Sequence, residues 1–143
     1  MSDPIQAVLD RKGTHVEVTH PRMTVLAAVD RMNELHVGAL MVSDGDRPLG
    51  ILTERDVMIR VIARHLDPEA TLVGEVMTRE LVSIHPHATI AEAMVLMTDR
   101  RCRHLPVLEG DELRGILSIG DLMSWMVRDQ ERTIADLHDY ICH

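Results

Sequence analysis

A chain of 143 residues with 45% hydrophobic residues can bury a core, which excludes a disordered protein. Its formal net charge of −8 and its single lysine provide no basic face, so we expect neither a nucleic acid nor a membrane surface as a partner. Aromatic residues make up only 1% of the chain, which also argues against stacking on single-stranded nucleic acid.

The first half of the chain predicts a helix, a strand, a second helix, a hairpin and a third helix. The strand ends before Pro21, since the residue that precedes a proline favours extended backbone. The expected elements are a helix with Asp3 as its N-cap and Pro4 in its first turn, a strand over His15–Thr19, a helix that begins after Thr24, strands over Ala39–Val42 and Leu49–Leu52, and a helix that opens at Thr53 and runs over Asp56–Ala63.

The second half repeats the first after a shift of 65 positions, which aligns thirteen identical pairs without a gap between His20 and Asp56 and their counterparts. Thr89 is followed three residues later by Glu92, a pattern typical of a capping box at the start of a helix. The expected elements are a strand over Glu80–Ile84, a helix that begins after Thr89, strands over Leu105–Leu108 and Leu113–Leu117, a helix over Asp121–Val127 and a C-terminal helix over Asp129–Ile141. The order β-α-β-β-α therefore occurs twice.

Each repeat places a hydroxyl and a carboxylate at the start of its last helix, Thr53 with Asp56 and Ser118 with Asp121. A hydroxyl beside the free N–H groups of a helix start suits a phosphate, and the carboxylate can accept hydrogen bonds from both hydroxyls of a ribose. The alternative is purely structural: the hydroxyls are N-caps, and the acids are favoured by the helix dipole. Because both acids lie in a first turn, we expect that either can be replaced without unfolding the chain.

The repeat order, the closures Gly-Ile-Leu-Thr-x-x-Asp and Gly-Ile-Leu-Ser-x-x-Asp, and the segment Arg103-His104-Leu105-Pro106-Val107 resemble pairs of CBS (cystathionine-β-synthase-type) domains. The resemblance covers nearly the whole chain. It implies an α/β fold in which two tandem β-α-β-β-α repeats pack about a pseudo-two-fold axis into one module. The expected boundaries are residues 1–68 for the first repeat with its N-terminal helix, 69–128 for the second repeat, and 129–143 for the C-terminal helix.

The resemblance also implies two clefts that bind an adenine nucleotide, in which Thr53 or Ser118 contacts phosphate and the following acid contacts the ribose. The residues implied for the first cleft are Thr19, Gly38, Ala39, Leu40, Thr53, Arg55 and Asp56. Those implied for the second cleft are Ile84, Arg103, His104, Leu105, Pro106, Ser118 and Asp121. The second set carries more positive charge, so we expect the second cleft to prefer more highly phosphorylated nucleotides.

These features predict a regulatory module that senses an adenine nucleotide, catalyses no reaction and requires no cofactor. AMP, ADP and ATP are the expected ligands, while NAD(H) and S-adenosylmethionine stay open. We expect two copies to associate through Met- and Leu-rich helical faces into a homodimer, and an effector protein to respond to the ligand. The two cysteines form no ligand-like pair and no apolar run is long enough to span a membrane, so the cytoplasm is the expected location.

Two other interpretations remain open. The chain could be a ligand-free dimeric interaction scaffold with vestigial clefts, or a metal- or redox-responsive stress protein that uses its nine histidines and two cysteines. The best clusters for the second interpretation are His85-Pro86-His87 and the group of His138, Cys142 and His143. Neither a Cys-x-x-Cys nor a His-Glu-x-x-His pattern occurs, so we expect no specific metal site.

Overall fold

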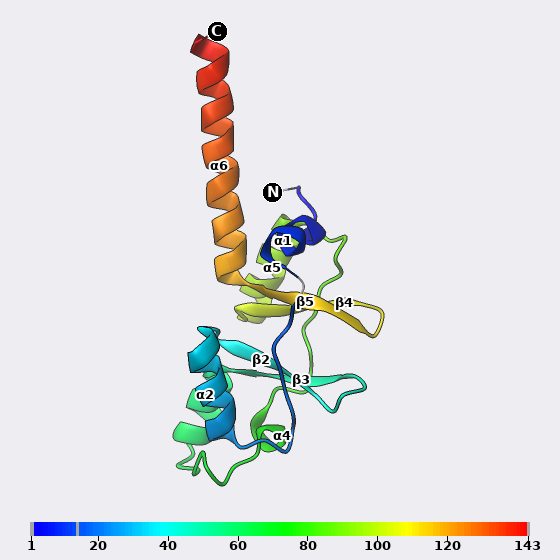
Figure 1. Cartoon of the computed structure of the whole chain (residues 1–143), viewed down its shortest axis with the longest axis vertical. Coiled ribbons are helices and arrows are strands. Elements are labelled where there is room, and N and C mark those ends of the chain that lie inside the picture. Colours follow the sequence, from blue (N-terminus) through cyan, green and yellow to red (C-terminus); the bar gives the residue numbers. More distant parts are fainter. Residues whose placement is uncertain (1, 14, 143) are drawn as a thin grey trace. The chain divides into compact units, whose positions relative to one another are not determined.

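The computed structural model describes residues 2–13 and 15–142, with side chains up to Ile141. Helices and two small sheets alternate along the chain, which confirms the expected α/β fold (Figure 1). In chain order the elements are α1 (Ile5–Lys12), β1 (Val18–Thr19), α2 (Val25–Leu35), β2 (Ala39–Ser43), β3 (Pro48–Thr53), α3 (Glu54–Val57), the π-helix η1 (Met58–Ile62), α4 (Val73–Val76), α5 (Ile90–Arg100), β4 (His104–Glu109), β5 (Glu112–Ser118) and α6 (Ile119–Cys142).

The chain folds into two compact units, and neither is a single stretch of sequence. We call them the terminal unit, which comprises Met1–Thr14, Ser83–Glu109 and Arg114–His143, and the middle unit, which comprises His15–Val82 and Gly110–Leu113. The helix α1 thus belongs with the second repeat, and α4, which precedes the second repeat in sequence, belongs with the first. Each unit therefore combines segments from both of the expected repeats.

Hydrogen bonds between backbone groups explain this exchange of leading helices. In the terminal unit the N–H groups of Ile5 and Gln6 donate to the carbonyls of Ala88 and Pro86, at 2.8 and 2.9 Å. In the middle unit the equivalent bonds run from Val73 to Met23 and from Gly74 to Pro21, at 2.8 and 2.9 Å. Each repeat therefore satisfies the first amides of the helix that leads the other repeat, groups that have no partner within their own helix.

The middle unit is built on a three-stranded sheet in the order β1-β2-β3, with β1 parallel and β3 antiparallel to β2. Leu40 and Leu52 are register partners, and both are fully buried. The expected N-cap Thr24 is confirmed, because its side chain accepts a hydrogen bond from the Ala27 N–H at 3.1 Å. The buried core consists of Val25, Ala28, Met32, Leu40, Val42, Leu52, Val61, Val73, Val76 and Met77. The last three come from α4 and the residue after it, so this core is incomplete without the exchanged segment.

The terminal unit contains the β4–β5 hairpin and the helices α1, α5 and α6. The capping box of α5 is confirmed, since Thr89 accepts from the Glu92 N–H and the Glu92 side chain accepts from the Thr89 N–H. The strand expected over Glu80–Ile84 is reduced to one parallel bridge between Ile84 and Val107. The expected N-cap at Asp3 is wrong: Pro4 occupies that position, and the Asp3 carboxylate instead accepts a hydrogen bond from Trp125 Nε1 at 3.0 Å.

A single helix, α6, replaces the two helices expected over Asp121–Val127 and Asp129–Ile141. No proline or glycine interrupts the sequence between these segments, so the helix continues without a break. After β3, by contrast, the single helix that was expected is divided in two. The α-helix α3 has four residues and is followed by the π-helix η1.

Two glycines at matching places in the repeats lie against the exchanged segments. A Cβ atom at Gly50 would lie 2.6 Å from the carbonyl oxygen of Thr78, and one at Gly115 would lie 2.8 Å from Cδ2 of Leu9. The backbone of β3 and of β5 can approach these segments only because glycine has no side chain.

We expect Gly50→Ala to lower the free energy of unfolding by about 1–3 kcal/mol, because its Cβ meets a backbone oxygen that cannot move alone. Gly115→Ala should cost less, since the group it meets is the end of a flexible leucine side chain. Gly120→Ala is the control, because its nearest neighbour is Ser118 Oγ at 3.6 Å. Urea unfolding of the three variants checks the order, and equal losses would contradict it.

Candidate functional site

The first hydroxyl–acid pair lies where β3 ends and α3 begins. The N–H of Thr53 donates to Asp56 Oδ2 at 2.9 Å, and the N–H of Asp56 donates back to Thr53 Oγ1 at 3.3 Å, so the pair forms a capping box. The other carboxylate oxygen, Oδ1, accepts from the Thr78 hydroxyl at 2.8 Å. Asp56 is only 7% exposed, and both of its oxygens are engaged within the protein.

The second pair lies where β5 ends and α6 begins. The N–H of Ser118 donates to Asp121 Oδ2 at 2.8 Å, and the N–H of Asp121 donates to Ser118 Oγ at 3.1 Å. Lys12, the only lysine of the chain, places its ammonium group 2.6 Å from the same Oδ2. The Asp121 side chain remains 23% exposed.

The two acids are therefore held by different chemistry from equivalent places. Thr78 follows the exchanged helix α4, and Lys12 ends the exchanged helix α1. The first acid receives a neutral hydroxyl, whereas the second receives a cation. The sequence analysis predicts neither partner. A weak signal that α1 and α4 are equivalent helices does exist, because Ile5, Val8 and Leu9 have the same apolar spacing as Val73, Val76 and Met77.

Most of the other residues expected in the first cleft gather beside Thr53. The Gly38 carbonyl accepts from the Glu54 N–H at 3.0 Å, and Ala39 is the register partner of Thr53. The Leu40 side chain is fully buried, so only its backbone could face a ligand. Arg55 is exposed in the first turn of α3. Thr19 is not brought to this place, because it pairs with Val42, three residues along β2 from Ala39 or about 10 Å.

The second cleft is assembled in the same way. The Arg103 carbonyl accepts from the Ile119 N–H at 2.9 Å, which brings the start of β4 to the start of α6. Ile84 lies at the place equivalent to Thr19: it pairs with Val107, three residues along β4 from His104, and its N–H donates to the Pro106 carbonyl at 3.0 Å. Leu105 and Pro106 are buried, whereas the Arg103 side chain is exposed and His104 is half-buried.

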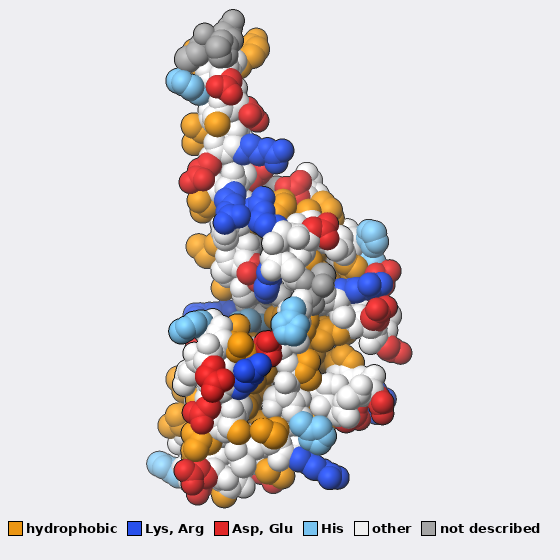
Figure 2. Space-filling model, in the orientation of Figure 1, with side chains coloured by type: hydrophobic (Ala, Val, Ile, Leu, Met, Phe, Trp, Pro, Cys, Tyr) orange, Lys and Arg blue, Asp and Glu red, His pale blue; other side chains and the backbone are white. Residues whose placement is uncertain are grey.

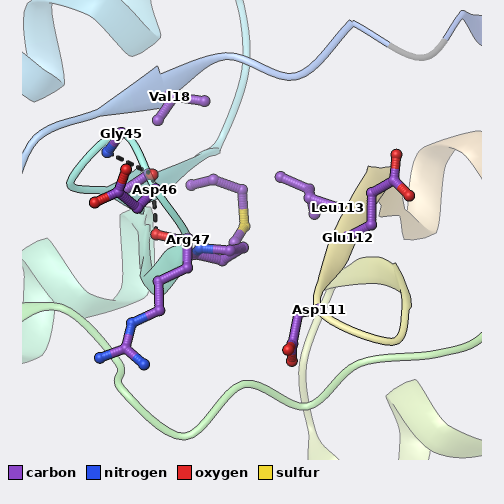
Figure 3. Close-up of a pocket in the computed structure, with 10 residues that line it drawn as sticks. Val18, Gly45, Asp46, Arg47, Asp111, Glu112 and Leu113 are labelled. Carbon is purple, nitrogen blue, oxygen red and sulfur yellow. Dashed lines mark hydrogen bonds between the residues drawn. The ribbon is translucent and has the colours of Figure 1, made fainter.

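A pocket of about 230 Å³ lies in the middle unit, and neither Thr53 nor Asp56 lines it (Figure 3). It is lined by Val18, Met41, Ser43, Gly45, Asp46, Arg47, Pro48, Asp111, Glu112 and Leu113. None of these residues was expected in a cleft, because turn residues of a hairpin normally serve only as connections. Three carboxylates against one arginine make this pocket unsuited to a phosphate.

The metal and redox interpretation receives no support from the described part of the chain. Within residues 2–13 and 15–141, no three potential ligands of the His, Cys, Asp and Glu types come together. The rings of His85 and His87 stack on each other, with centroids 5.1 Å apart. Burial raises the pKa of the Cys102 thiol, which lowers the fraction of reactive thiolate. His143 and the side chain of Cys142 lie outside the described residues.

The two acids are expected to contribute differently to stability, because their hydrogen-bond partners differ. We expect Asp56→Ala to lower the free energy of unfolding by about 1–3 kcal/mol, because it leaves the Thr53 N–H and the Thr78 hydroxyl without their acceptor. Asp121→Ala should cost less than about 1 kcal/mol, since its pair with Lys12 is partly solvated. Chemical denaturation of both variants tests this difference; a larger loss for Asp121→Ala would refute it.

Comparison with known proteins agrees with this geometry. The family model of the CBS domain matches the chain twice, over residues 7–63 and 73–128. The CBS domain-containing protein YhcV of Bacillus subtilis is 36% identical over 118 residues, which cover 82% of this chain and 84% of that protein. The mitochondrial CBS domain-containing protein CBSX3 of Arabidopsis thaliana is 37% identical over 123 residues, which cover 82% of this chain but only 60% of that protein.

A solved structure of a CBS-domain protein from Burkholderia ambifaria superposes with a TM-score of 0.86 at 37% identity, covering 90% of this chain and 96% of that one. Both repeats thus match the same family model, and the fold matches a protein with the same domains over nearly its full length. The chain belongs to the CBS-domain family and carries a pair of CBS domains, the arrangement of a regulatory module.

Proposed function

We propose that this pair of CBS domains is a non-catalytic sensor of adenine nucleotides. The observation that carries the proposal is the hydroxyl–acid pair that recurs at a strand end and helix start in each unit, Thr53 with Asp56 and Ser118 with Asp121. Helix starts favour phosphate groups, and a carboxylate in the first turn is placed to accept hydrogen bonds from ribose hydroxyls.

The second cleft is the stronger candidate for occupancy. Both hydrogen bonds that the Asp121 carboxylate is described above as accepting end on Oδ2, so Oδ1 is the oxygen that we propose accepts from the ribose. Asp56 uses both of its oxygens internally, so a ribose there would have to displace the Thr78 hydroxyl. The cost of leaving a buried hydroxyl unpaired would weaken binding at the first cleft.

Charge also separates the two clefts. Arg103 precedes β4 and His104 begins it, beside the second pair, and Lys12 forms an ion pair with Asp121 itself. The first cleft has Arg55, and its matching strand start is uncharged at Gly38 and Ala39. Each additional phosphate needs more positive charge to offset its desolvation, so the second cleft should prefer ATP over AMP more strongly than the first.

Regulation requires that a ligand bind one arrangement of the protein better than another, since a ligand with equal affinity for both shifts nothing. We propose that the nucleotide supplies this difference and that an effector protein responds to the resulting change. We also propose that the protein acts as a homodimer in the cytoplasm.

Among the described helices, none is both long and apolar enough to cross a membrane. A ligand-free scaffold is the second candidate, and titration with AMP, ADP and ATP separates the two.

Asp121→Ala should weaken adenine nucleotide binding at the second cleft ten- to a hundredfold, or about 1.5–3 kcal/mol, because it removes a charged acceptor for the ribose. Asp111→Ala is the matched control, since it removes one carboxylate from a hairpin turn that lies outside both clefts. Calorimetric titration gives the affinities. Unchanged binding in Asp121→Ala would show that this acid does not hold the ribose.

Arg103→Ala should lower the affinity for ATP more than the affinity for AMP, because its guanidinium is proposed to face the outer phosphates. Arg55→Ala removes the same charge from the first cleft and should leave the second cleft unchanged. The two ligands are titrated into both variants and the parent protein. Equal losses for ATP and AMP in Arg103→Ala would mean that this arginine does not distinguish the phosphate chain.

A further inference from the structure

The C-terminal half of α6 extends beyond the packed part of the terminal unit (Figure 1). Leu122 is fully buried, whereas every residue of the helix from Val127 to Ile141 is exposed. This exposed stretch is about 22 Å long at the rise of an α-helix. An isolated helix of this length is only marginally stable in water, and most protein helices depend on an apolar face that packs against a partner.

Such a face is present on the exposed stretch and just before it. The apolar residues of one stripe are exposed by 55% at Met123, 53% at Val127, 67% at Ile134, 56% at Leu137 and 79% at Ile141. Hydrophobic side chains are visible along one edge of this helix (Figure 2). With Gln130 included, the positions are separated alternately by four and three residues, which is the spacing of a coiled-coil seam.

The other side of the helix carries five charged residues together with Ala135. The charged residues are Arg128, Asp129, Arg132, Asp136 and Asp139. The helix is therefore amphipathic over its exposed length, and the charged side needs no partner because it is solvated. A second helix that covered only the seam would remove the apolar stripe from water.

We propose that this stripe pairs with the same stripe of a second copy, as a parallel two-stranded coiled coil. Val127, Ile134 and Ile141 occupy one seam position, and all three are β-branched. Leu137 occupies the other position. β-Branched residues at the first position with leucine at the second favour two parallel strands. The pairing rests on the homodimer proposed above, but it does not depend on nucleotide binding.

Gln130 determines the orientation and register. In a parallel pair the amide of Gln130 faces the same amide of the partner, so the two can hydrogen-bond to each other. In an antiparallel pair that keeps the seam, Gln130 faces Ile134 or Ile141, and a buried amide is left without a hydrogen bond. Flanking positions do not oppose the parallel pair, because Glu131 faces the partner's Met126 and His138 faces the partner's Thr133.

The test compares two single substitutions to glutamate in the full chain. Leu137→Glu places a charge in the seam, and Ala135→Glu places the same charge on the solvated side. We expect Leu137→Glu to raise the dissociation constant of self-association at least tenfold in sedimentation equilibrium, measured against the 16.1 kDa chain mass, while Ala135→Glu changes it less than threefold. Equal effects of the two substitutions, or a parent protein that is monomeric throughout, would overturn the proposal.

Two further variants guard against a loss of folding and report the orientation. Gln130→Leu should tighten association at least fivefold, an effect that unfolding of the helix cannot produce. Gln130→Cys, with Cys102→Ser and Cys142→Ser as background, should form a disulfide-linked dimer on oxidation, whereas Arg132→Cys in that background should not. Weaker association in Gln130→Leu, or crosslinking only in Arg132→Cys, would contradict the parallel pair.

Discussion

The close approach between each repeat and the helix that leads the other repeat is the constraint on which the rest of the structure depends. It needs glycine at Gly50 and Gly115, because a Cβ atom there would lie 2.6 Å from the Thr78 carbonyl oxygen or 2.8 Å from Leu9. It also completes the cores, since Val73 and Val76 are buried within the first repeat. Neither repeat can therefore complete its core with its own contiguous sequence.

The same exchange reaches the proposed ligand sites. The exchanged segments supply Thr78 to Asp56 and Lys12 to Asp121, so the acid in each cleft is held by a residue at the end of an exchanged segment. A neutral donor in one cleft and a cation in the other make the two sites unequal, although the repeats share a motif. A ligand that competes for either acid would also disturb the packing of an exchanged segment, which gives a physical route from binding to a change in the protein.

Local features could be predicted from the sequence, because they depend on neighbouring residues. The caps at Thr24 and Thr89, both hairpins and the two hydroxyl–acid pairs are of this kind. Contacts between distant segments could not: Lys12 lies 109 positions from Asp121, and a repeat pattern does not reveal which copy a leading helix joins. The N-cap expected at Asp3 is wrong for the same reason, because the partner of Asp3, Trp125, is remote in sequence.

Amide hydrogen–deuterium exchange of Leu9→Ala tests most directly whether each leading helix packs against the other repeat. Leu9 is fully buried and lies against Gly115, so its truncation should leave a cavity beside β5. We expect faster amide exchange in β4 and β5, with a smaller change in β2 and β3, although Leu9 precedes the first repeat in sequence. Faster exchange chiefly in β2 and β3, or an equal increase in both sheets, would contradict it.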